Sequence, residues 1–300
     1  MSAVHDVPQA GIFALGTASH CYLEFDLREG AEPRGLVALV ASLREPRTTI
    51  GGVNLVSGFR PGLWRELGAT APAELRDFAE PVRGDDGFEM PATQHDALLW
   101  LSGSAYDVVF DEARAAINCL APVATAAAET TSWPYRHDRD LTGFVDGTEN
   151  PSLALAPDVA VVPDGRPGAG GSVVLLQRWL HAAAAWEALS VTEQERVMGR
   201  TKADSVELDP RPVDSHVART DQGDFGDIFR RNMPYGTVGE HGTMFVGFAR
   251  EQQPLQRMLE SMAGVGGQRD ALTRYATPLT GAYYFVPSVG ALRAFASETA

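Results

Sequence analysis

Residues 11 to 27 read GIFALGTASHCYLEFDL, and residues 35 to 44 read GLVALVASLR. The first stretch is typical of a strand with a possible break at Gly16, and the second has the apolar spacing of a helix. A strand-like pattern returns between Thr49 and Phe59. These three segments predict a β-α-β unit, which is the start of the pattern that decides the fold.

The same order recurs along the rest of the chain. Later strands are expected at 96–102, 123–131, 171–181, 242–250 and 280–286, and helical segments at 106–120, 184–199 and 254–263. Thr192 and Glu195 match the spacing of a capping box at a helix start. A repeated β-α-β, β-α-β predicts an α+β protein built from two ferredoxin-like domains, a duplicated split βαβ with antiparallel sheets. The domains are expected to span residues 1–140 and 141–300.

Composition narrows the class of protein. With 300 residues, 44% of them hydrophobic, the chain can bury a substantial core. A net charge of -14 and the lack of a basic run argue against a nucleic-acid partner. No apolar run approaches the ~20 residues of a membrane span, and the start does not resemble a secretion signal, so we expect a cytoplasmic protein. Two cysteines, Cys21 and Cys119, are too few for a disulfide framework.

Three segments could carry chemistry. The first, residues 140–151, reads DLTGFVDGTENP, a composition that forces turns. Asp146 and Glu149 in it are either turn-forming and solvated, or a pair of catalytic carboxylates such as a glycosidase uses.

The second segment, residues 199–219, contains His216 without a neighbouring histidine at zinc-binding spacing. His216 is either structural or a single metal ligand, which is how an imidazole binds haem iron. The third segment, residues 227–236, reads DIFRRNMPYG. It is either a solvated turn or a cationic donor, with Asn232 as a neutral partner, aimed at developing negative charge.

Taken together, the motifs resemble the dye-decolourising peroxidase family, class B, over essentially the whole chain. The resemblance rests on G-x-x-D-G at residues 143–147 continuing as TENP, on GRTK at 199–202 leading to SHVAR at 215–219, on RRNMPYG at 230–236, and on TG at 280–281 through FVPS at 285–288. The family's duplicated ferredoxin-like fold agrees with the element order above.

The resemblance implies a haem b pocket in the C-terminal half. It makes His216 the proximal iron ligand and places Asp146, Arg230 and Asn232 on the peroxide-binding face. Further cofactor-binding positions implied by the signature are Gly147, Thr148 and Glu149. Asp270 is the candidate that orients His216, with a helix N-cap as its alternative role.

Two assignments have competitors in the sequence. Arg230 is preferred to Arg231 because it lies two residues before Asn232, as in the family's R-x-N pattern, whereas Arg231 could face a propionate or solvent. If the family resemblance failed, the axial ligand could be another histidine, namely His5, His20, His95, His137, His181 or His241.

The activity implied is that of a haem b peroxidase. H2O2 would oxidise the ferric haem to a ferryl porphyrin-radical intermediate, which takes single electrons from dyes, phenols or other bulky aromatic reductants. Asp146 suits the transfer of a proton between the peroxide oxygens, and Arg230 suits stabilisation of the departing oxygen. The alternatives are a haem-binding or iron-handling protein of the same fold and, more remotely, a carboxylate-pair hydrolase that uses Asp146 and Glu149.

Two expectations concern assembly. Exposed sheet edges and the prevalence of closed symmetry favour a homo-oligomer. Some class B relatives are packaged in encapsulin shells by a C-terminal extension. Because this sequence ends 12 residues after Ser288, packaging by such a tail is doubtful.

Overall fold

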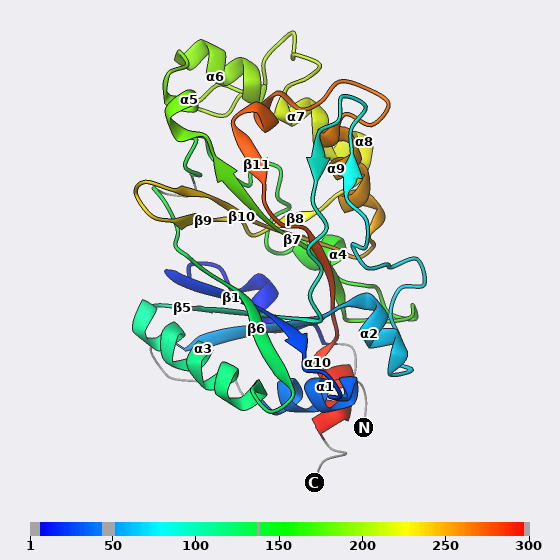
Figure 1. Ribbon diagram of the computed structural model, residues 1–300. Helices are drawn as coiled ribbons and strands as arrows, with labels where there is room; N and C mark the ends of the chain where they lie inside the picture. The colour runs from blue at the N-terminus through cyan, green and yellow to red at the C-terminus, as the bar shows by residue number, and fades with distance from the viewer. Residues whose placement is uncertain (1–6, 44–51, 137–138, 297–300) are drawn as a thin grey trace.

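The strands form two antiparallel layers that are joined along their edges (Figure 1). The computed structural model describes residues 7–43, 52–136 and 139–296. One layer has the order β2-β5-β1-β6 and the other the order β12-β7-β10-β9. Phe285 pairs with Phe59 at one junction, and Ser132 pairs with Tyr235 at the other.

The N-terminal layer has the predicted β-α-β, β-α-β order. Its elements are β1 (Ser19–Leu27), α1 (Pro33–Ser42), β2 (Val53–Phe59), β5 (Ala97–Gly103), α3 (Tyr106–Leu120) and β6 (Ala124–Ser132). All its neighbouring strands pair antiparallel. Between β2 and β5 the chain forms α2 (Pro61–Glu66) and the small hairpin of β3 (Val82–Arg83) and β4 (Glu89–Met90). The ferredoxin-like arrangement predicted for this half is confirmed.

The C-terminal layer repeats this arrangement with longer insertions. Its strands are β7 (Ser172–His181), β9 (Met233–Gly236), β10 (His241–Ala249) and β12 (Ala282–Val286). Strand β9 was not predicted, because it is short and contains Pro234 at the edge of the layer. The remaining elements of this half are α4 (Ala156–Ala160), α5 (Ala183–Glu187), α6 (Val191–Met198), α7 (His216–Arg219), α8 (Gln222–Phe225), β8 (Phe229–Arg230), α9 (Gln253–Ala263), η2 (Ala271–Arg274), β11 (Ala276–Pro278) and α10 (Val289–Ala296).

Alternating side chains on the strands build two cores. Tyr22 and Trp100 from one layer pack with Val174, Phe248 and Tyr284 from the other in a single buried cluster, so the two layers face each other. The opposite face of the N-terminal layer packs against α1 and α3. Helix α10 returns to the N-terminal layer and lies beside α1 (Figure 1). The boundary near residue 140 stays a prediction, although the chain passes from one layer to the other between β6 and β7.

Two local predictions were wrong, and the first concerns the start of strand β1. The stretch expected to begin a strand at Gly11 instead forms a 3-10 turn, η1 (Ala10–Phe13), and β1 begins only at Ser19. Gly16 lies between them with φ of +76°, which makes the expected break real.

The capping box predicted from Thr192 and Glu195 lies two residues earlier. Ser190 is the N-cap of α6 and accepts from the backbone of Glu193, whose carboxylate accepts from Ser190 N at 2.8 Å. Thr192 lies inside the helix, and Glu195 accepts instead from Lys202 N. The helical segment expected over 184–199 is divided into α5 and α6.

The ends of two other predicted elements, Arg44 and residues 49–51, lie outside the described residues. No helix in the described part of the chain combines the length and the apolar character that crossing a membrane requires.

Candidate functional site

A deep pocket lies on the outer face of the C-terminal layer. Leu175, Gln177 and Trp179, which alternate along β7, form part of its wall, and α7 and α9 contribute other parts. Every lining residue falls between Asp140 and Ala276. The pocket therefore lies in the C-terminal half of the chain, as predicted. Its lining includes all of the candidate site residues predicted from the sequence except Asp270, which lies directly behind His216.

His216 is held at the start of a short helix. Ser215 caps α7 by accepting from Ala218 N, so His216 is the first residue of the helix. Its Nδ1 donates to Asp270 Oδ2 at 2.7 Å, and Asp270 is fully buried. With Nδ1 occupied in this way, Nε2 is the nitrogen left to bind a ligand in the pocket. The second oxygen of Asp270 caps η2 by accepting from Leu272 N, so the carboxylate fills both of the roles that the sequence left open.

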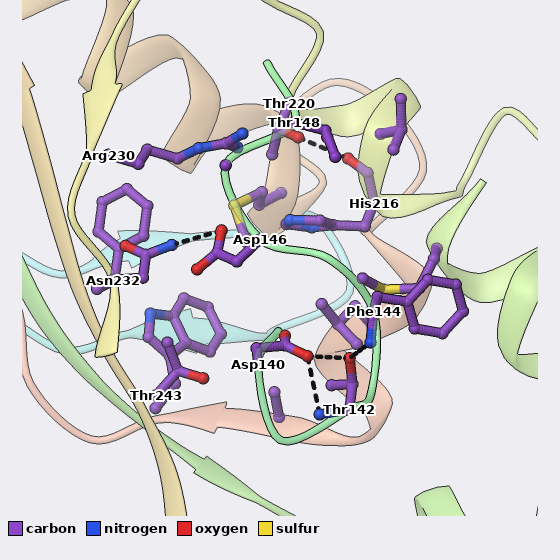
Figure 2. A pocket seen from close by; sticks show the side chains of 18 of the residues that line it. Asp140, Thr142, Phe144, Asp146, Thr148, His216, Thr220, Arg230, Asn232 and Thr243 are labelled. Atoms are coloured by element: carbon purple, nitrogen blue, oxygen red, sulfur yellow. Dashed lines mark hydrogen bonds between the residues drawn. The ribbon is translucent and has the colours of Figure 1, made fainter. Parts of the chain in front are cut away.

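Asp146, Arg230 and Asn232 lie together across the pocket from His216 (Figure 2). Asn232 Nδ2 donates to Asp146 Oδ1 at 3.3 Å, and Asn232 Oδ1 accepts from Val246 N at 3.1 Å. Arg230 Nε is buried without a hydrogen-bond partner among the described residues. The three residue types therefore present a carboxylate, a guanidinium and an amide to one space that faces an imidazole.

Arg231 points to the other side of the backbone. It is buried among the N-terminal residues, where its guanidinium donates to Ile12 O and Ala14 O at 2.7 Å and lies 5.0 Å from the ring of Trp100. Burial lowers the pKa of Arg231 to about 10. Successive residues of an extended segment project to opposite sides, so Arg230 lines the pocket and Arg231 does not.

The signature residues after Asp146 also line the pocket. Gly147 has φ of +76°, a conformation that favours glycine, and Thr148 and Glu149 are exposed at the pocket rim. The Glu149 carboxylate forms an ion pair with Arg200, which also binds Glu207 at 2.8 Å. Glu149 is thus engaged by a cation, an arrangement that does not favour its use as a hydrolytic nucleophile.

A further pocket carboxylate, Asp140, was missed by the sequence analysis. Thr142 donates to it from both its backbone N, at 2.9 Å, and its hydroxyl. Burial, and next the negative charge of Asp146, raise the pKa of Asp140 to about 6. Nothing in the sequence signals this, because Asp-x-Thr is an ordinary turn pattern whose exposure depends on the fold.

The competing histidines are placed elsewhere, with one exception. His181 lines the pocket, where its Nε2 lies 3.1 Å from the Thr243 hydroxyl and burial lowers its pKa to about 4. His20 is fully buried beside Trp100. Neither His95, which pairs with Asp26, nor His241 lines the pocket. His5 and His137 lie outside the described residues.

The donor set fits a haem better than a bare metal ion. In the described part of the chain no three His, Cys, Asp or Glu side chains gather into a metal-binding group. A single imidazole is sufficient for iron only when a porphyrin supplies four more ligands. Apolar side chains suit a flat macrocycle, and the pocket wall has many of them, including Phe144, Phe245, Leu255 and Met258.

Comparisons with known proteins agree with this geometry. A family profile described as Dyp-type peroxidase, C-terminal, matches residues 137–291. A dye-decolorizing peroxidase of Mycolicibacterium paratuberculosis is 38% identical over 267 residues, which are 85% of this chain and 74% of that protein.

Solved structures are similar over nearly the whole chain. A DypB variant of Rhodococcus jostii RHA1 in complex with heme has a TM-score of 0.88 and 33% identity, covering 97% of this chain and 99% of that one. The encapsulated DyP-type peroxidase of Mycobacterium smegmatis has a TM-score of 0.83 and 33% identity, covering 97% and 98%.

Proposed function

The chain belongs to the Dyp-type peroxidase family, whose members are oxidoreductases, and from this premise we propose that it is a haem b peroxidase that uses H2O2 to oxidise bulky aromatic reductants. The observation that carries the proposal is the imidazole of His216, oriented by a buried carboxylate, which faces Asp146, Arg230 and Asn232 across one pocket. The bound haem in a solved relative supports the choice of cofactor.

In this proposal His216 would hold the haem iron through Nε2, and Asp270 would raise the donor strength of the ring by accepting from Nδ1. Gly147, Thr148 and Glu149 form the rim of the cofactor pocket beside the signature Asp146. The haem, when bound, supplies the redox centre at which the peroxide is reduced.

The residues opposite His216 handle protons and charge. Asn232 donates to Asp146 Oδ1, which leaves Oδ2 as the atom that takes a proton from the inner oxygen of the peroxide and returns it to the outer one. The departing oxygen gains negative charge as the O–O bond breaks. Arg230 stabilises that charge as a fixed cation at the pocket wall, where its Nε is buried.

Bulky reductants are expected to react at the protein surface, with electrons passing through aromatic side chains. We also propose that the protein is cytoplasmic and assembles as a closed homo-oligomer.

A set of four variants tests the proposal. His216→Ala is expected to lose most of its haem, measured as haem content per folded protein, while His181→Ala, another pocket histidine, retains it. Arg230→Leu and Asp146→Asn are expected to keep haem and to slow the reaction with peroxide by about a hundredfold or more. Unchanged peroxide kinetics in both of the latter variants would refute the assigned roles.

A further inference from the structure

The side chain of Asn150 takes the place of a neighbouring strand beside Arg230. Strand β8 pairs on one side with β10, where Arg230 lies opposite Gly247. On its other side, Asn150 Oδ1 accepts from Arg230 N at 2.8 Å, and Asn150 Nδ2 donates to Arg230 O at 2.8 Å. A primary amide carries an acceptor oxygen and a donor NH2 group side by side, so one side chain can pair with both the N–H and the C=O of a single residue. The main chain of Arg230 is therefore fixed on both sides.

Asn150 belongs to the same turn as Asp146. Its backbone N donates to Gly147 O at 2.9 Å, and a Cβ on Gly147 would lie 3.0 Å from Asn150 Nδ2. The turn is thus compact only with glycine at that position. Because Asp146 directly precedes this turn, any shift of Asn150 also shifts the carboxylate.

The contacts close into a ring around one side of the pocket. Asp146 begins the turn, Asn150 ends it on Arg230, and Asn232, two residues after Arg230, donates back to Asp146. Gln222 adds a parallel link between the same two segments, since it donates to Glu149 O at 2.9 Å and accepts from Ile228 N at 3.1 Å. The loop and β8 are therefore linked at several points, through Asn150, Gln222 and Asn232.

We propose that Asn150 is a positioning residue that sets where the Arg230 guanidinium points and couples it to Asp146. Arg230 Nε has no hydrogen-bond partner in the described part of the chain, so the backbone at Arg230 has a large share in placing the side chain. Asn150 itself acts through that backbone and does not touch the reacting atoms. The inference rests on the proposed function, because it assigns Asn150 to the peroxide-binding face of the haem.

Fluoride binding to the haem-loaded protein tests the inference without turnover. Fluoride on ferric haem is an anion that a distal guanidinium stabilises, and its affinity can be read from the visible spectrum. Arg230→Leu is expected to weaken fluoride by about thirtyfold, and Asn150→Ala by about tenfold, since each removes or misplaces a charge-assisted hydrogen bond. In the double variant, Asn150→Ala is expected to add less than about twofold, as for residues that act as a unit.

Two further variants control for general loosening of the structure. Gln9 makes the same kind of amide clamp outside the pocket lining, where Ser57 N donates to it at 2.7 Å and it donates to Ser57 O at 2.9 Å. Gln9→Ala is expected to lower stability and leave fluoride affinity unchanged. Asn150→Asp retains the acceptor for Arg230 N and loses the donor, so it keeps a folded variant available and is expected to weaken fluoride by about threefold.

The results separate the possible failures. Wild-type fluoride affinity in both Asn150 variants would overturn the inference. An effect of Asn150→Ala that persists in full in the Arg230→Leu background would also overturn it, and so would an unchanged fluoride affinity in Arg230→Leu itself. Failure of the wild-type protein to bind haem would instead be seen as a missing Soret band before any fluoride is added, and it would refute the proposed function first.

Discussion

Replacing Asp140 by asparagine should make the protein more stable at neutral pH and flatten its response to acid. The pKa of Asp140 is raised by burial and by Asp146 from 3.8 to about 6. At about 1.4 kcal/mol per pH unit, this difference corresponds to about 3 kcal/mol of folding free energy. Asp140 is only half-buried, and solvent screens part of the effect, so we expect about 1.5 kcal/mol.

The sign follows from the raised pKa. Between about pH 4 and pH 6 Asp140 holds a proton in the folded state that the unfolded chain has released. The contribution of protonated Asp140 to the folding free energy is therefore fully present below about pH 4 and is lost as the pH rises through about 6. Asparagine at this position cannot ionise and still accepts from Thr142. The stability of Asp140→Asn relative to the wild type should therefore rise from near zero at pH 4 to about 1.5 kcal/mol at pH 8.

Urea unfolding of the haem-free proteins at pH 4, 5, 6, 7 and 8 measures this difference directly. Ser190→Ala, which disrupts a capping box away from Asp140, serves as a control of opposite sign. Because the Ser190 hydroxyl lowers the pKa of Glu193, the stability of this variant relative to the wild type should fall as the pH rises over the same range. A difference between Asp140→Asn and the wild type that stays constant with pH would refute the reasoning.

Three more variants separate the roles of neighbouring groups. Asp270→Asn should weaken the hydrogen-bond acceptor for His216 Nδ1. Haem transfer from this variant to apomyoglobin should be faster by about tenfold or more, and the reduction potential of the haem should be higher. An unchanged reduction potential would contradict an orienting role for Asp270. Arg231→Leu should lower the free energy of unfolding in urea by about 2 kcal/mol, because the carbonyls of Ile12 and Ala14 lose their donor. The rate of reaction with peroxide should stay close to that of the wild type. A peroxide rate as low as that of Arg230→Leu would show that the two arginines were assigned wrongly. Gly147→Ala should destabilise the protein by about 1–2 kcal/mol, because a φ of +76° is strained for a residue with a Cβ. Thermal unfolding measures the loss, and an unaltered Tm would count against the compact turn.

Much of the fold could be predicted from periodicity, because strands and helices with one buried face repeat apolar residues at fixed spacing. Helix α3 illustrates this, whereas β5 is buried along its whole length and is predictable from its continuous apolar run. Strand β9 carries no such pattern in its four residues and exists because β10 and the edge of β6 pair with it. Tertiary pairing of this kind is not visible in a local window.

The capping box shows a different limit. Ser190 with Glu193 and Thr192 with Glu195 both match the capping pattern, so the spacing alone allows two helix starts. The structure selects Ser190, whose backbone is extended at ψ of 156°, as an N-cap requires.

Some of the pocket residues could be predicted from motifs, whereas others depend on tertiary contacts. His216, Asp146, Arg230 and Asn232 belong to motifs, and the structure brings all four into one pocket. Asn150 lies in the signature too, yet its contact with Arg230 joins residues 80 positions apart. A contact of that range depends on how the loop and β8 meet in the fold, which sequence patterns do not specify.

The most direct test of the central claim is an absorption spectrum of the protein expressed with a haem precursor, recorded before and after one equivalent of H2O2. We predict a Soret band that His216→Ala largely loses and that changes within the mixing time when peroxide is added. A well-folded wild-type protein that shows no Soret band despite ample haem, or a band that does not respond to peroxide, would contradict the account.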